Sequence, residues 1–238
     1  MKRLFLLSII CVLLFSCKKN VSKVNISTTT ITNSKSFNLK GRLENFYPKK
    51  VYLNKIIENT IYPIDSFSVI ENNFNFNGIV DFPERYAITF ENYSAVTIVI
   101  LENVEFEIYI NGNSINNPQI NGSPLNNKLS EYKVESKKIF KKIDHLFPQF
   151  QKARLENDAE KLLKIEQKMK IIENEFIKFS YNFIVQNKNS FVAAMILRDQ
   201  LKSSTIDTLL VKKTYQLLPS EVKNSPDAEI TASFLNLH

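Results

Sequence analysis

The sequence predicts an α+β fold: an antiparallel β-sandwich or open barrel, followed by a long antiparallel helical hairpin and short helices. Between Phe37 and Gly122 apolar residues recur at every second position, which is typical of half-buried strands. After Pro124 they recur at spacings of four and three, which is typical of one face of a helix. We therefore expect an antiparallel β domain over residues 37–123 and an α-helical region over residues 124–238.

Short strands separated by regularly spaced turns account for the first pattern. The alternation is clearest at Val104, Phe106, Ile108 and Ile110. Turn-forming residues interrupt the apolar runs at Asn45, Pro48, Asn72–Asn73, Pro83, Asn92, Asn103 and Asn111–Gly112. These residue types suit the backbone conformations of tight turns. About seven or eight short strands with such turns favour a sandwich or a barrel.

Two long helices are expected next. The first presents one apolar face from Leu125 to Ala153, and Pro148 within it should kink or interrupt the helix. Asn157, with Glu160 three residues later, has the pattern of an N-cap and its reciprocal acid, which predicts the start of the second helix. That helix carries a coiled-coil seam at Leu162, Ile165, Met169, Ile172, Phe176, Phe179 and Phe183. Because the link is short, the two helices should form an antiparallel hairpin.

Shorter helices should complete the chain. One is expected from Phe191 to Leu201, capped by Ser190, and another from Thr205 to Leu218, capped by Ser204. A last helix should begin at Ser225–Pro226, since proline suits a first helical position.

The N-terminus has the layout of a secretory signal. Lys2 and Arg3 precede an uncharged apolar run that is too short to span a bilayer. The sequence Leu14-Phe15-Ser16-Cys17 then resembles the bacterial lipobox, which implies a lipoprotein signal peptide over residues 1–16, a lipidated Cys17 and a tether over residues 17–36. Several acyl chains, such as palmitate, would anchor the protein stably to a membrane. The alternatives are an ordinary signal cut elsewhere, or an uncleaved anchor, with Cys17 an incidental thiol.

The residues after the lipobox indicate where the protein is located, and the positions of its two cysteines indicate which chemistry it lacks. The residues that follow Cys17 are Lys18 and Lys19, and not the acidic pair that resembles a surface-export signal in lipoproteins of the Bacteroidetes type. We therefore expect an outer-membrane protein that faces the periplasm. Cys11 lies in the signal and Cys17 would carry the lipid. The mature chain would then lack a free thiol for a disulfide, a thiolate nucleophile or a cysteine metal site.

Several blocks in the strand region occur in a recognisable order: Val51-Tyr52-Leu53, Ile64-Asp65-Ser66, Phe74-Asn75-Phe76-Asn77-Gly78, Pro83 with Tyr86, Ile100-Leu101-Glu102-Asn103, and Ile120-Asn121-Gly122-Ser123 with Asn126. Together they resemble the N-terminal domain of unknown function found ahead of the thioredoxin domain in Bacteroidetes TlpA/ResA-like thiol-disulfide interchange lipoproteins. This chain has neither Trp nor a Trp-Cys-x-x-Cys motif. The resemblance thus implies the accessory domain without redox activity of its own.

Candidate catalytic and metal-ligating residues are few. His145 and His238 have no partner at metal-ligand spacing, so we expect neither a metal site nor a cofactor. Asp65-Ser66 and Ser123 lack the Gly-x-Ser-x-Gly elbow of an activated serine. We expect no catalytic residues: Asp65-Ser66 should end or cap a strand turn, Gly122-Ser123-Pro124 should join sheet to helix, and Glu102-Asn103 should form a hairpin turn.

The charged residues indicate solvated helix faces. The first long helix is locally basic through Lys133, Lys137, Lys138, Lys141 and Lys142, and the formal net charge of +7 indicates solubility rather than nucleic-acid binding. Asp207-Thr208-Leu209 resembles the acceptor motif for O-glycosylation in Bacteroidetes secreted proteins.

The sequence leaves three functional interpretations open. The preferred one is a non-catalytic periplasmic lipoprotein that acts as a binding or interaction module for an envelope protein partner. The alternative is a small-molecule-binding protein or hydrolase with a pocket between sheet and helical hairpin, where Asp65 and Glu102 supply carboxylates. The third is self-association through the seam helices. The sequence favours no particular ligand or oligomeric state.

Overall fold

The computed structural model describes residues 36–58, 60–203 and 206–237, and all of them belong to one compact unit. The predicted signal peptide, Cys17 and the tether up to residue 35 lie outside the described residues, as does His238. Within the described ranges no helix is long and apolar enough to cross a membrane.

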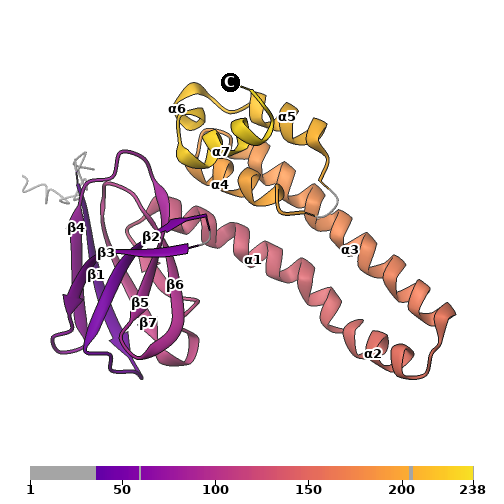
Figure 1. The fold of residues 1–238 in the computed structure, drawn as a ribbon, viewed down its shortest axis with the longest axis horizontal. Coiled ribbons are helices and arrows are strands. Elements are labelled where there is room, and N and C mark those ends of the chain that lie inside the picture. The colour runs from indigo at the N-terminus through magenta and orange to yellow at the C-terminus, as the bar shows by residue number, and fades with distance from the viewer. Residues whose placement is uncertain (1–35, 59, 204–205, 238) are drawn as a thin grey trace, which may run out of the picture. The chain divides into compact units, whose positions relative to one another are not determined.

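Eight strands form two four-stranded sheets (Figure 1). The first sheet has the order β4-β1-β7-β8 and the second has the order β3-β2-β5-β6. Their bounds are β1 Phe37–Glu44, β2 Lys50–Ile57, β3 Thr60–Ser68, β4 Asn73–Gly78, β5 Glu84–Phe90, β6 Tyr93–Leu101, β7 Glu105–Asn111 and β8 Gln119–Asn121. The sheets do not close into a barrel, so the β region is a sandwich, as the alternating pattern predicts.

The strand pairs are antiparallel except for β1 and β7, which run parallel. Alternation of apolar and polar residues is the same in both kinds of pair, so the sequence carries no signal for this difference. The chain can bring β7 beside β1 in the same direction because five strands lie between them in sequence.

The alternating side chains fill the space between the sheets. The inward residues of the first sheet include Leu39, Phe76, Phe106 and Ile108, and those of the second include Leu53, Ile88 and Val99. The expected turns at Asn45, Asn72 and Asn92 have left-handed φ angles of 61°, 63° and 62°. Asparagine tolerates this conformation better than most residues, which explains its use between strands.

The predicted helical hairpin is confirmed by α1 (Pro124–Asp144), α2 (Phe147–Leu155) and α3 (Ala159–Gln186). Pro148 lies in the first turn of α2, where the chain has left α1, so the predicted interruption is correct. Helices α1 and α3 lie side by side (Figure 1). The ring of Tyr132 stacks on Phe179 at 5.3 Å, and Phe140 meets Phe176 at 4.6 Å. The aromatic seam therefore closes within one chain.

One predicted helix cap and one predicted helix start are wrong. The N-cap of α3 is Asp158, whose carboxylate accepts a hydrogen bond from the backbone N–H of Lys161 at 3.0 Å. Asn157 instead has a φ of 52° just after α2 ends. Helix α5 (Thr208–Gln216) is capped by Asp207, and residues 206–207 are not helical, although the helix was expected from Thr205. The predicted cap Ser204 lies outside the described residues.

Four short helices pack near the C-terminal half of α3. They are α4 (Phe191–Gln200), α5, α6 (Ser220–Lys223) and α7 (Pro226–Phe234). Ser190 caps α4 and α7 begins after Ser225, as predicted. Helix α4 is apolar on nearly all sides and is buried in a second core with Ile184 of α3, Val211 of α5 and Ala228 of α7.

Candidate functional site

A buried polar cluster joins the sandwich to the start of α1. Glu102 follows β6 and is 8% exposed. Its Oε1 accepts hydrogen bonds from the hydroxyl of Ser123 and from the backbone N–H of Leu125, the latter at 2.9 Å. The carboxylate thereby occupies the N-terminus of α1, where the free N–H groups and the helix dipole favour a negative charge.

This position corrects the prediction that Glu102-Asn103 forms a hairpin turn. The strands before and after it, β6 and β7, belong to different sheets. The segment therefore crosses between sheets, and both side chains hold it in place. Asn103 donates to the carbonyl of Val80 at 2.7 Å and accepts from the N–H of Val80 at 3.0 Å.

Ser123 and Asn126 complete the cluster. Ser123 caps α1 and accepts from the backbone N–H of Asn126 at 3.2 Å and from its Nδ2 at 2.7 Å. Asn126 also donates to the carbonyl of Ile100 at 2.7 Å and accepts from the N–H of Ile100 at 2.9 Å. Gly122-Ser123-Pro124 is thus the junction of sheet and helix. Ser123 is fully buried and engaged as donor and acceptor, so its hydroxyl is not placed to attack a substrate.

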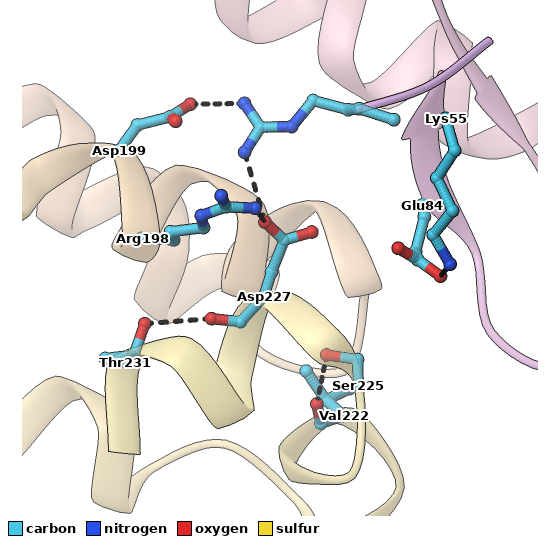
Figure 2. A network of polar contacts seen from close by, with 9 residues as sticks. Lys55, Glu84, Arg198, Asp199, Val222, Ser225, Asp227 and Thr231 are labelled. Atoms are coloured by element: carbon cyan, nitrogen blue, oxygen red, sulfur yellow. Dashed lines mark hydrogen bonds and ion pairs between the residues drawn. The ribbon is translucent and has the colours of Figure 1, made fainter. Parts of the chain in front are cut away.

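A second polar cluster connects β5 with α4 and α7 (Figure 2). Arg85 on β5 donates through Nη1 to Asp199 Oδ2 at 2.7 Å and through Nη2 to Asp227 Oδ1 at 3.1 Å. Arg198 donates to the same Oδ1 at 2.9 Å. The side chain of Asp227 is 5% exposed. One buried carboxylate thus pairs with two guanidinium groups from different parts of the fold.

The charges of this second cluster influence its neighbours. Burial opposes the charge on Arg85, but attraction and hydrogen bonds from Asp199 and Asp227 outweigh it and raise the pKa of Arg85. Burial lowers the pKa of Lys133 on α1, and the nearby charge of Arg85 lowers it further, whereas Asp199 acts in the opposite direction. Arg85 therefore stays charged, and the pKa of Lys133 lies below that of an exposed lysine.

The hollow beside this cluster is small. Its volume is about 160 Å³, and its charged lining includes Glu84, Arg85, Arg198, Lys202 and Asp227. Pockets for small-molecule ligands usually measure about 300–1,000 Å³. Because Arg85, Arg198 and Asp227 already pair with one another, we interpret the cluster as a structural joint. No local sequence pattern predicts this joint, since Arg85 is separated from Asp199 and from Asp227 by more than a hundred positions.

A larger hollow of about 510 Å³ lies between β8, the end of β6 and α1, where the sequence suggested a pocket. The two carboxylates considered for hydrolysis do not line it. Glu102 caps α1, and Asp65 lies within the exposed edge strand β3, where it accepts from the N–H of Ser66 at 2.7 Å. Asp65-Ser66 was expected at the end of a strand, and this placement corrects that prediction. The structure therefore does not bring the two acids together.

The remaining candidate residues lie apart from these clusters. His145 is the C-cap residue of α1. Asp207 uses its carboxylate to accept from the N–H of Leu210 at 3.0 Å, and Thr208 after it is exposed. In the part of the chain that the structure describes, no group of three or more His, Cys, Asp or Glu side chains could hold a metal ion.

Comparison with known proteins identifies the β region. No curated protein and no solved structure matches the chain. A family model described as a domain of unknown function (DUF4369) matches residues 37–129. The match includes all eight strands, Glu102, and the start of α1 with Ser123 and Asn126. Residues 37–129 are therefore similar to a domain whose function is unknown, and this match covers less than half of the chain.

Proposed function

We propose that this protein is a membrane-anchored periplasmic lipoprotein, held at the outer membrane by a lipidated Cys17, that acts as a non-catalytic interaction module. The resemblance of Leu14-Phe15-Ser16-Cys17 to a lipobox supports the anchor. The resemblance of the β region to the accessory domain of thiol-disulfide interchange lipoproteins supports the envelope location.

The main support for a non-catalytic role is that the two buried carboxylates of the polar clusters already have structural partners. Glu102 caps a helix, and Asp227 neutralises two guanidinium groups. Polar groups of this kind in a catalytic site would face a cleft and leave bonding capacity for a substrate. Here both carboxylates accept hydrogen bonds that connect the sandwich to the helices.

The far end of the helical hairpin supplies a surface for a protein partner. Large apolar side chains are exposed there, including Phe147 at 53% and Leu155 at 85%. Clustered exposed apolar residues are typical of interaction sites. The exposed ion pairs Lys152–Glu156 on α2 and Lys164–Glu160 near the start of α3 would contribute to a polar rim.

Mass spectrometry of the N-terminal peptide from membrane-isolated protein tests the anchor. We expect a peptide that begins at Cys17, lacks residues 1–16 and carries the mass of acyl chains. An unmodified Cys17 thiol, or an intact Met1, would overturn the lipoprotein assignment.

Photocrosslinking in living cells tests the partner surface. A photoreactive phenylalanine at Phe147 or at Leu155 should yield an adduct of one common size with an envelope protein. The matched control carries the probe at Lys188, which is exposed at the other end of α3. Absence of adducts at both hairpin positions, or equal adducts from all three positions, would contradict the proposal.

The second candidate function is that of a small-molecule-binding protein. The hollow of about 510 Å³ between β8 and α1 favours it, because this volume falls in the usual range for ligand pockets. The hydrolase form of this alternative has no support from Asp65 and Glu102, which lie in separate places.

A further inference from the structure

Three hollows adjoin along the short edge strand β8. Their volumes are about 550, 300 and 510 Å³, and Gln119 lines all three. Tyr109 lines the first two, and Asn117 lines the last two. Because the hollows share lining residues they lie next to one another, and we treat them together as one depression that extends from the outer face of the β4-β1-β7-β8 sheet to α1.

The strand register determines what this depression presents. Arg42 pairs with Tyr109 across β1 and β7, and Tyr109 pairs with Gln119 across β7 and β8. Partners across a ladder point to the same face of the sheet. Arg42, Tyr109 and Gln119 therefore form a row on the outer face. Ile120 packs against the sandwich core, which turns its neighbours Gln119 and Asn121 outward.

Five exposed carboxamides contribute to the lining, and we call the depression that they line the amide groove: Asn113, Asn117, Gln119, Asn121 and Asn127. None of these side chains hydrogen-bonds to another residue that the structure describes. Each carboxamide offers two N–H donors and an oxygen with two lone pairs. The groove thus holds a concentrated set of neutral donors and acceptors whose bonding capacity is available.

Charge is scarce in the part of the groove between Tyr109 and α1. Lys133 is the one charged residue among the described residues that line these two hollows. Burial and the neighbouring Arg85 lower its pKa. The remaining hollow is also lined by Lys40, Arg42 and Glu107, so charges of both signs occur there. A ligand with many charges of one sign would find few matching counter-charges between Tyr109 and α1. This part of the groove suits a ligand that is polar and uncharged.

An aromatic ring lies in the middle of the groove. Tyr109 is half-buried, and its hydroxyl donates to the carboxylate of Glu44, which restrains the ring. Glu44 also accepts from Nδ2 of Asn111 at 2.7 Å. An aromatic side chain combines an apolar face with a polar tip, and a restrained one costs less entropy on binding.

From these features we infer that the amide groove binds a neutral oligosaccharide. Sugar hydroxyls and acetamido groups both donate and accept hydrogen bonds, as the free carboxamides do. The C–H face of a sugar ring can lie on the ring of Tyr109. Three adjoining hollows match a chain of several sugar units better than a single monosaccharide. This inference rests on the second candidate function, and it does not depend on Cys17 or on a hairpin partner.

Calorimetric titration of the full chain in mild detergent tests the inference. The neutral probes are chitotetraose and maltohexaose, and a heparin-derived tetrasaccharide is the anionic probe. We expect at least one neutral probe to bind, and the anionic probe to bind at least tenfold more weakly. Binding of no neutral probe, or preference for the anionic probe, would overturn the inference.

Two double variants locate the site. Removing two carboxamides with Gln119→Ala and Asn121→Ala should weaken binding by about thirtyfold, which corresponds to about 2 kcal/mol for two lost hydrogen bonds. The matched control, Gln167→Ala with Asn182→Ala, removes two exposed carboxamides from α3 and should bind like the original protein. Equal affinity of both double variants would overturn the assignment of the site. An unchanged melting temperature shows that the substituted proteins are folded.

A variant of the central aromatic residue tests how sugar is held. Tyr109→Phe keeps the ring but loses the bond to Glu44, and should retain most of the affinity. Tyr109→Ala removes the ring and should weaken binding by about tenfold, on the scale of other ring-stacking contacts. If the Tyr109→Ala and Tyr109→Phe variants bind the sugar with equal affinity, the ring of Tyr109 does not contact the sugar. Either result leaves lipidation and hairpin crosslinking untouched, so the two proposals fail independently.

Discussion

At the scale of single residues, buried polar side chains determine how the sandwich meets the helices. Glu102 and Asp65 illustrate the difference that burial makes. Both are acids of the β region, yet Glu102 holds the start of α1 whereas Asp65 lies on an exposed edge strand. A carboxylate therefore contributes to stability at the buried position and contributes little at the exposed one.

Replacing Glu102 by Ala should lower the free energy of unfolding by about 1–3 kcal/mol, because the Ser123 hydroxyl and the Leu125 N–H lose their acceptor inside the protein. Asp65→Ala should change it by less than about 0.5 kcal/mol, as is usual at exposed sites. Urea denaturation measures both values. Equal losses would contradict the role assigned to Glu102.

A close contact between Gly41 and Phe74 gives another prediction at this scale. These residues pair across β1 and β4, and a Cβ on Gly41 would lie 2.0 Å from Phe74 Cζ. Gly41→Ala should therefore destabilise the protein by about 1–3 kcal/mol through overpacking. Adding Phe74→Leu should recover part of the loss in thermal denaturation. A fully additive loss in the double variant would show that the two side chains do not collide.

At the scale of elements, helix α3 links the hairpin seam to the second core. Tyr181 near its C-terminal end is 9% exposed, and burial, with a smaller contribution from the charge of Asp207, raises the pKa of its phenol to about 12. In the unfolded chain the phenol ionises near pH 10. The stability that Tyr181 contributes is present below about pH 10 and is lost as the pH rises toward 12.

Tyr181→Phe removes this titration. We expect the variant to match the original protein at pH 8 and to lose about 1–2 kcal/mol less stability between pH 10 and pH 12. Denaturant unfolding at several pH values measures the difference. Tyr86, Tyr132 and Tyr215 also have raised pKa values, so the variant should still weaken in alkali. Parallel pH profiles of the two proteins would show that ionisation of Tyr181 does not cause the loss of stability in alkali.

At the scale of the described molecule, the joint around Asp227 couples sandwich and helices. Asp227→Ala leaves Arg85 and Arg198 without their shared partner. Loss of one member of a buried pair is costly, and since the guanidinium groups are about a quarter exposed we expect a loss of about 2–3 kcal/mol. Asp199→Ala removes a side chain that is 38% exposed and should cost about 1 kcal/mol or less. Chemical denaturation that ranks the two variants in the opposite order would refute this role.

Local sequence patterns determined most of the elements of this protein. Alternation at Val104, Phe106, Ile108 and Ile110 predicted β7, and the spacing from Leu162 to Phe183 predicted α3. Such patterns are reliable because one buried face imposes its period on the residues near it in sequence. The N-cap of α3 did not follow from the local pattern. Asn157 and Asp158 are both good capping residues, and the path of the backbone selected Asp158.

Only the tertiary structure decided the parallel pairing of β1 with β7, the joint of Arg85 with Asp199 and Asp227, and the course of the amide groove along β8. Each depends on which distant segments meet, and no periodicity within a segment records that choice. Strand pairing and salt bridges are set by contacts that close long loops, whereas helix and strand patterns are set by each segment's own buried face. The sequence alone thus determined an α+β chain with a sandwich and a hairpin, and the packing of its distant parts determined the positions of the joint around Asp227 and of the amide groove.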